Sequence, residues 1–526
     1  MQKQSVRLLT TVLLLGWFFD YLFYKHTPGI SFTVYAVATL TGGYILLRLQ
    51  NIHPARSTLL LLGGIIFFMV MTVLRAEPLS MLLSHALTLL LMAVMAVSYR
   101  GGQWWRYSLL DYFSRAWGLF VSVWTRPLFL LLGRHSSANE EDVSRKTGSH
   151  FWPVVRGVLL ALPVLIFFAS LLSSADLVFA ARLNVLLDLF RLENIGEYLF
   201  RLIYILFLGY ILAGVYLHAS ERSADENLPG REKPLVQPFL GFIEANIILG
   251  SVVLLFTSFV IIQFQYFFGG QANIHLDGMT YAEYARRGFG ELVSVAFFVI
   301  LLFLVLAGIT CRETSFKKKI FSIFSLVLLV QVAIMLVSAY QRLVLYEDAY
   351  GFTRLRTYTH VFMFWVAVLL ASLTILDLFQ RQRSFALVAL LSALGFAISL
   401  TVLNVDVFIF NQNMARFEQG QSLDVGYLAS LSTDVVPSVV HVYESTGENE
   451  KKHDYLGAVL ACTQYMMTQN ERDTSWQAFN YSRYQAWREI EREHETLKVY
   501  RVDDSSWPVQ VFTPSGEEFD CQSSMD

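Results

Sequence analysis

The stretch QFQYFFGGQANIHLDGMTYAEYARRGFGEL, residues 263–292, joins two long apolar segments through a loop rich in ionisable residues. The first apolar segment ends near residue 268, and the second begins at Phe289. A helix needs about 20 predominantly apolar residues to cross about 30 Å of hydrocarbon, and both segments are long enough. The stretch therefore predicts a protein that crosses a membrane several times.

The loop itself predicts a short capped helix at the membrane surface. Thr280 and Glu283 have the T-x-x-E spacing in which each side chain bonds to the backbone N–H of the other residue. Glu283 also precedes Arg286 and Arg287 by three and four residues, which permits an ion pair. An arginine at the bilayer centre costs at least about 2.5–3.5 kcal/mol, so we expect both arginines at the water interface. They could serve there as a membrane anchor or as part of a binding site.

The same loop carries a family resemblance. FQYFFGG at 264–270, followed by TYAEYARRGFGEL at 280–292, resembles a bacterial family of polytopic membrane proteins named as domain of unknown function 4173. Three later stretches are similar to that family: AYGFTRLRTYTHVFMFW at 349–365, NVDVFIFNQNMARFEQGQSLDVGYLASLS at 404–432 and TSWQAFNYSRYQAW at 474–487. The resemblance extends from about residue 150 to about 490. It implies an architecture and supplies no catalytic residues.

The composition also indicates a membrane protein. Only 16% of the 526 residues are charged and 55% are hydrophobic, whereas soluble proteins have about 25% charged residues. The net charge is −2 and no basic block is present, so we expect no nucleic-acid partner. The three cysteines form no C-x-x-C or Cys/His cluster, so we expect no metal and no cofactor. The expected partner is the lipid bilayer.

Hydropathy predicts about eleven spans in an all-α membrane helix bundle. They lie near residues 6–24, 30–49, 57–74, 79–98, 152–172, 198–218, 239–268, 289–311, 320–340, 359–379 and 385–403. Residues 104–132 and 175–197 mix charges with apolar residues, which favours helices lying in the headgroup plane. The expected parts are a four-span block with an interfacial helix (1–132), a cytoplasmic linker (133–150), a seven-span domain (151–403) and a small, mainly helical domain (404–526).

Lysine and arginine predict the orientation, because cytoplasmic loops carry an excess of them. The excess falls on the side of the N-terminus if that end is cytoplasmic. We expect the protein in a bacterial inner membrane, where eleven spans then place the segment after residue 404 outside the cytoplasm. There, Trp476, Phe479, Tyr484, Trp487 and Ile490 predict an amphipathic helix, and WPVQVFTP at 507–514 predicts one strand.

The C-terminal segment also holds two cysteines, Cys462 and Cys521. On the oxidising side of the membrane they would form a disulfide, and the alternative is a pair of free thiols. Within the spans, only His85 and Gln331 are deep, and a hydrogen bond to a neighbouring helix would explain each.

Charged residues gather in the loops predicted to face outward. The candidate outer-face cluster comprises Tyr281, Glu283, Tyr284, Arg286, Arg287, Glu347, Arg354 and Arg356. Arginines beside tyrosines can hold phosphate or carboxylate groups, so we expect an anionic ligand or an envelope protein as a partner there. Pairing with neighbouring acids and lipid phosphates is the alternative.

The sequence favours a non-enzymatic envelope protein that senses or scaffolds through its outer face and C-terminal domain. No nucleotide-binding, metalloprotease or nucleophile-elbow motif is present. A transporter of small solutes or lipids is the alternative, for which the glycine pairs Gly42-Gly43 and Gly63-Gly64 give the only hint of broken helices. An intramembrane transferase is a third interpretation.

Overall fold

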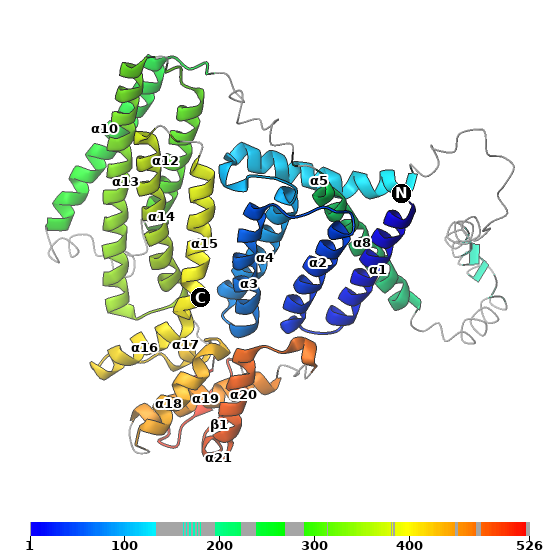
Figure 1. The fold of residues 1–526 in the computed structure, drawn as a ribbon. Coiled ribbons are helices and arrows are strands. Elements are labelled where there is room, and N and C mark those ends of the chain that lie inside the picture. The colour runs from blue at the N-terminus through cyan, green and yellow to red at the C-terminus, as the bar shows by residue number, and fades with distance from the viewer. Residues whose placement is uncertain are drawn as a thin grey trace. The chain divides into compact units, whose positions relative to one another are not determined.

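The computed structural model describes residues 2–132, 195–221, 238–268, 289–312, 314–379, 384–447, 451–469, 475–505 and 507–521, with a few single positions between 161 and 381. These residues form an all-α polytopic helix bundle with three short strands near the C-terminus (Figure 1). The predicted fold class is confirmed.

Within the described ranges, ten helices are long and apolar enough to cross a membrane. They are α1 (Gln2–Phe23), α2 (Ile30–Arg48), α3 (Arg56–Leu74), α4 (Pro78–Ser98), α8 (Ile195–Ser220), α10 (Phe242–Phe268), α12 (Phe289–Ile309), α13 (Ser315–Tyr350), α14 (Arg354–Leu378) and α15 (Phe385–Leu403). They coincide with ten of the predicted spans, and the protein is a multi-pass membrane protein. The linker 133–150 and all but a few positions of the predicted span near 152–172 lie outside the described residues.

Helix α13 is much longer than its predicted span. Its 36 residues would measure about 54 Å at 1.5 Å per residue, whereas the hydrocarbon layer is about 30 Å thick. At least one end of α13 must therefore project beyond the hydrocarbon, and its last turns carry Glu347 and Asp348.

The first mixed segment forms the short helix η1 (Trp104–Arg106) and then α5 (Leu109–Leu132). Helix α5 is not among the ten span candidates, and its interfacial position stays a prediction. Its Trp117 and Trp124 side chains are exposed. The second mixed segment, 175–197, lies almost entirely outside the described residues.

The chain divides into two compact units. The first comprises residues 1–24, 41–51 and 119–218, and in it α1 packs closely against α8. A Cβ atom on Gly16 would lie 2.6 Å from the Ile205 carbonyl oxygen, so the two backbones approach directly. Buried Asp20 accepts hydrogen bonds from Arg201 (Nε to Oδ1, 3.0 Å) and from the Tyr204 hydroxyl. The intramembrane acid is therefore paired with a cation, as burial of a charge requires.

The second unit comprises residues 25–40, 52–118 and 219–526, which include the first part of α2 and the span helices α3, α4, α10, α12, α13, α14 and α15. Helix α13 packs against α10, α12 and α14, while α15 lies between α14 and α4 (Figure 1). Gln331 of α13 donates to the Thr257 hydroxyl of α10 at 2.7 Å, which confirms its predicted interhelical bond. His85 differs from the prediction, because its Nδ1 bonds to the Met81 carbonyl oxygen of its own helix at 2.7 Å.

The C-terminal segment belongs to this second unit and gathers at one end of its span helices. Its elements are α16 (Val405–Glu418), α17 (Val425–Ala429), η6 (Thr433–Val435), α18 (Val436–Ser445), α19 (Lys451–Gln469), η7 (Trp476–Ala478), α20 (Tyr481–Arg492), α21 (His494–Leu497), β1 (Arg501–Asp503), β2 (Gln510–Phe512) and β3 (Glu518–Asp520). The strands form an antiparallel sheet in the order β1-β2-β3, in which only β2 matches the predicted strand. The apolar core of this segment continues into Leu400 of α15.

The predicted amphipathic helix is shorter than expected, and of the residues predicted for its apolar face only Ile490 is among its buried side chains. Asn480 accepts a hydrogen bond from the Arg483 backbone N–H, so α20 begins at Tyr481 and excludes Trp476 and Phe479. The buried side chains of α20 are Ser482, Ala486 and Ile490, spaced four residues apart. Ile490 lies on the buried face as predicted, whereas Tyr484 is exposed.

Cys462 of α19 and Cys521, which follows β3, are joined by a disulfide with their Cα atoms 5.3 Å apart. Both cysteines are buried. The bond ties the last strand to the central helix of the segment.

Candidate functional site

Polar side chains connect the C-terminal segment to two short connections between span helices. These connections are residues 75–77, between α3 and α4, and residues 351–353, between α13 and α14. We call the set of contacts the latch and define it by Glu77, Arg354, Asp406, Asp434 and Asn480.

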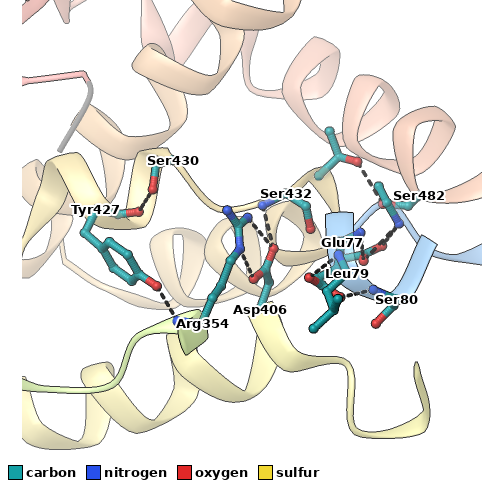
Figure 2. A network of polar contacts seen from close by, with 12 residues as sticks. Glu77, Leu79, Ser80, Arg354, Asp406, Tyr427, Ser430, Ser432 and Ser482 are labelled. Atoms are coloured by element: carbon teal, nitrogen blue, oxygen red, sulfur yellow. Dashed lines mark hydrogen bonds and ion pairs between the residues drawn. The ribbon is translucent and has the colours of Figure 1, made fainter. Parts of the chain in front are cut away.

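The central contact of the latch is an ion pair between Arg354 and Asp406. The Arg354 Nε and Nη2 atoms lie 2.8 and 2.7 Å from the two Asp406 carboxylate oxygens, and the aspartate is fully buried (Figure 2). The Ser432 backbone N–H also donates to Asp406, at 2.7 Å. Asp406 lies in the first turn of α16, where a negative charge is favoured by the helix dipole. Arg354 begins α14, where a positive charge is disfavoured, so the pair offsets this cost.

Tyr427 holds the same connection from α17. Its hydroxyl oxygen accepts a hydrogen bond from the Arg354 backbone N–H at 2.7 Å (Figure 2). This N–H is at the start of α14 and has no partner within the helix. Burial raises the pKa of Tyr427, so the hydroxyl stays neutral and can act in hydrogen bonding only.

A second group of contacts surrounds the connection between α3 and α4. The Asp434 carboxylate accepts hydrogen bonds from the Ala76 and Glu77 backbone N–H groups, each at 3.1 Å to Oδ2. Glu77 in turn caps α4, because its oxygens accept from the Leu79 and Ser80 N–H groups at 2.8 and 2.7 Å (Figure 2). Burial raises the pKa of Asp434, although hydrogen bonds from the Ser482 side chain and the Ala76 N–H favour the charged form.

Asn480 and the residues just before it make further contacts with the ends of span helices. Asn480 donates from Nδ2 to the Arg75 carbonyl oxygen at 2.9 Å, which satisfies a group left open at the end of α3. The Ile30 backbone N–H donates to the Phe479 carbonyl oxygen at 2.8 Å, so the start of α2 also contacts the C-terminal segment. A Cβ atom on Gly29 would lie only 2.5 Å from the Ala478 backbone, so a larger residue would push the chains apart.

Helix α16 also holds the connection between α13 and α14. The Asn413 side chain accepts from the Phe352 N–H and donates to the Phe352 carbonyl oxygen, both at 2.9 Å. Arg416 donates from Nη1 to the Glu347 and Asp348 carbonyl oxygens at 2.7 Å, which places a cation at the C-terminal end of α13.

The predicted cluster residues that the structure describes all have partners within the chain. Arg354 takes part in the ion pair above. Glu347 is buried, and its Oε2 lies 2.7 Å from His360 Nε2. Arg356 donates to the Gly351 carbonyl oxygen, and its guanidinium lies 4.0 Å from the centre of the Tyr346 ring. The other predicted members lie outside the described residues: Tyr281, Glu283, Tyr284, Arg286 and Arg287.

Sequence reasoning missed Glu77 and Asn480. Glu77 precedes Pro78, and an acceptor followed by proline at the first helical position is a recognised helix start. Asn480 similarly caps α20.

Among the described residues, no group of three or more histidine, cysteine or acidic side chains could hold a metal ion. The contacts that define the latch are hydrogen bonds and one ion pair between distant parts of the chain.

Comparison with known families adds one match. No curated protein and no solved structure matches this chain. The model of the family described as Domain of unknown function (DUF4153) matches residues 62–442, a range that contains most of the latch. The specific family that the sequence resembled, domain of unknown function 4173, is not confirmed. Because the match covers well over half of its residues, the chain belongs to the DUF4153 family of proteins with unknown function.

Proposed function

We propose that this multi-pass membrane protein is a non-enzymatic scaffold or sensor of the bacterial inner membrane that acts through residues 404–521. The observation that carries the proposal is the fully buried Asp406, paired with Arg354 of a span helix. Loss of one partner from such a pair leaves a buried charge uncompensated and strongly destabilises the fold around it. The position of the C-terminal segment therefore depends on this one ion pair. A partner of this segment would thereby act on the span helices.

We further propose that the N-terminus is cytoplasmic and residues 404–521 are extracytoplasmic. Contacts support a shared side, because residues 29–30, 75–77 and 351–354 all bond to or pack against the C-terminal segment. The distribution of lysine and arginine assigns that side to the exterior. The expected partner is an envelope protein or an anionic ligand.

Helix continuity supports a scaffold over a transporter. Helices α2 and α3 run unbroken through the glycine pairs at 42–43 and 63–64. Transporters often build their sites from interrupted helices, and these two pairs do not supply an interruption.

Reporter fusions test the orientation. Alkaline phosphatase fused after Asp526 should be active, and a fluorescent protein that folds only in the cytosol should stay dark at the same position. The reverse pattern would refute the extracytoplasmic assignment.

A charge swap tests the latch as a functional coupling. Arg354→Asp should accelerate protease cleavage within residues 419–424. Arg354→Asp combined with Asp406→Arg should restore part of the resistance, because the ion pair returns while the Ser432 N–H loses its acceptor. A pull-down with the full chain should then lose its envelope partner in the single variant and regain it in the double variant. Unchanged cleavage, with solute flux in proteoliposomes that persists after residues 404–526 are deleted, would refute the scaffold and favour the transporter.

A further inference from the structure

A cavity of about 180 Å³ lies within the second unit, beside the latch. The last turn of α3 supplies its apolar side through Met71 and Leu74, while η6 and α20 supply polar groups. A water molecule occupies about 30 Å³ of liquid, so the cavity has room for about six waters, or for a group of comparable size.

One polar group in the wall has no partner. The Oδ1 atom of Asn404 is buried and makes no hydrogen bond. Asn404 has a φ of 52°, a left-handed conformation that asparagine adopts more readily than most residues. The backbone thus explains an asparagine or a glycine at this position. It does not explain a buried carbonyl oxygen against a cavity, which calls for a hydrogen-bond donor in that space.

Opposite charges line the same space. Arg75 uses Nε to donate to the Thr401 carbonyl oxygen at 2.9 Å, and its planar guanidinium carries further N–H groups on the terminal nitrogens. Asp434 lies in the cavity wall and accepts hydrogen bonds from two backbone N–H groups and from the Ser482 side chain. A carboxylate offers about four acceptor positions, so about one remains for an occupant of the cavity.

The position of Arg75 relates the cavity to the membrane surface. Arg75 directly follows α3, one of the span candidates, so its charge belongs at the level of the lipid headgroups. Met71 and Leu74 belong to the final turn of the span. An occupant of the cavity would therefore meet charged groups on one side and the edge of the apolar layer on the other.

We propose that this cavity binds a zwitterion, with a phosphate or carboxylate on Arg75 and an ammonium group between Asn404 Oδ1 and Asp434. Guanidinium groups bind such anions in a forked geometry, and an ammonium supplies three donors. An ethanolamine phospholipid and a free aminophosphate or amino acid share this chemistry. The site stands apart from the proposed function, because it requires no protein partner.

Binding to the delipidated full-length protein tests the site. The probes are palmitoyl-oleoyl phosphatidylethanolamine and phosphatidylglycerol with the same acyl chains, measured by native mass spectrometry, and glycerophosphoethanolamine, measured by calorimetry. Arg75→Gln should weaken binding about tenfold or more, because it removes a charged partner. Asn404→Gly should weaken it roughly two- to tenfold and suits the left-handed backbone. Arg483→Gln changes an exposed arginine outside the cavity and should leave binding unchanged.

The probes separate the two sources of the ligand. Binding of the ethanolamine lipid alone supports a lipid site, and binding of glycerophosphoethanolamine supports a site for the free zwitterion. Equal binding of phosphatidylglycerol would overturn the proposal, because that lipid lacks the ammonium. Unchanged affinity in Asn404→Gly, and in Arg75→Gln where it folds, would overturn it as well.

Discussion

Arg354 and Asp406 lie 52 positions apart in the chain and meet through two parallel hydrogen bonds at 2.7 and 2.8 Å. The pair connects the first residue of a span helix to the first turn of α16. Asp406 is completely buried, while the Arg354 side chain keeps 24% of its surface exposed. Most of the desolvation penalty therefore falls on the aspartate, and the arginine is what stabilises it there.

Asp406→Asn should destabilise the C-terminal segment by about 3 kcal/mol. Loss of one partner from a buried ion pair typically costs about 3–5 kcal/mol, and the partial exposure of Arg354 places this case at the lower end. Pulse proteolysis in detergent would measure the change.

The matched control for Asp406→Asn lies on the same helix. Glu418 pairs with Lys452 at 2.7 Å, but its side chain is 62% exposed. Glu418→Gln should therefore change stability by less than about 1 kcal/mol. Equal effects of the two variants would contradict the role assigned to the latch.

Asp434 should make stability fall as the pH rises through the acid range. Burial raises the pKa of Asp434, so the folded protein holds this proton to a higher pH than the unfolded chain does. Its contribution to stability is then complete below the ordinary aspartate pKa, about 3.9, and is lost as the pH rises through the raised value. Asp434→Asn should remove that dependence in unfolding experiments from pH 3.5 upward.

Asp503 provides a control of opposite sign. The Ser505 hydroxyl and backbone N–H lower the pKa of Asp503. Its contribution is present above the ordinary pKa and is lost as the pH falls through the lowered one. Asp503→Asn should therefore remove a rise of the unfolding free energy with pH, whereas Asp434→Asn should remove a fall. If both variants changed the pH dependence of stability in the same direction, the assignment would be refuted.

The Cys462–Cys521 bond should exist in the protein isolated from cells. Alkylation without reductant should label Cys311, the free thiol, and should leave the other two cysteines unlabelled until they are reduced. Reduction should lower the free energy of unfolding of the C-terminal segment by roughly 4 kcal/mol in the chain-entropy model. Labelling of all three cysteines before reduction would show that the bond does not form.

Gly395→Ala should loosen the packing of α14 against α15. A Cβ atom at this position would lie 2.1 Å from the Trp365 ring, which is fixed by a 3.0 Å hydrogen bond from its Nε1 to the Ser399 hydroxyl. Overpacking of this kind costs about 1–3 kcal/mol and would appear as a lower thermal unfolding temperature. Gly63→Ala is the control, because a Cβ atom there meets nothing within 4 Å. A decrease in both variants would point to helix flexibility instead.

The span helices could be predicted because hydropathy acts locally. An apolar run such as 385–403 must become a helix in lipid, where every backbone group needs a partner within the segment. The C-terminal helix at 476–490 was less predictable. Its pattern predicted Tyr484, Trp487 and Ile490 on the buried face, yet the buried residues of α20 are Ile490, Ser482 and Ala486. Burial of a given face depends on what lies opposite it, and this information is not local.

The sequence by itself determined the membrane class and ten described spans to within a few residues, except at the ends of α13, and it singled out Arg354 as a charged residue between two spans. Only the tertiary structure decided its partner. Asp406, Asp434 and Asn480 are separated in the chain from the groups they bind by 52, 358 and 405 positions. Hydropathy reflects the exchange of each residue between water and lipid, one residue at a time. A buried ion pair depends on the relative positions of two distant backbones, which are established only when the helices pack.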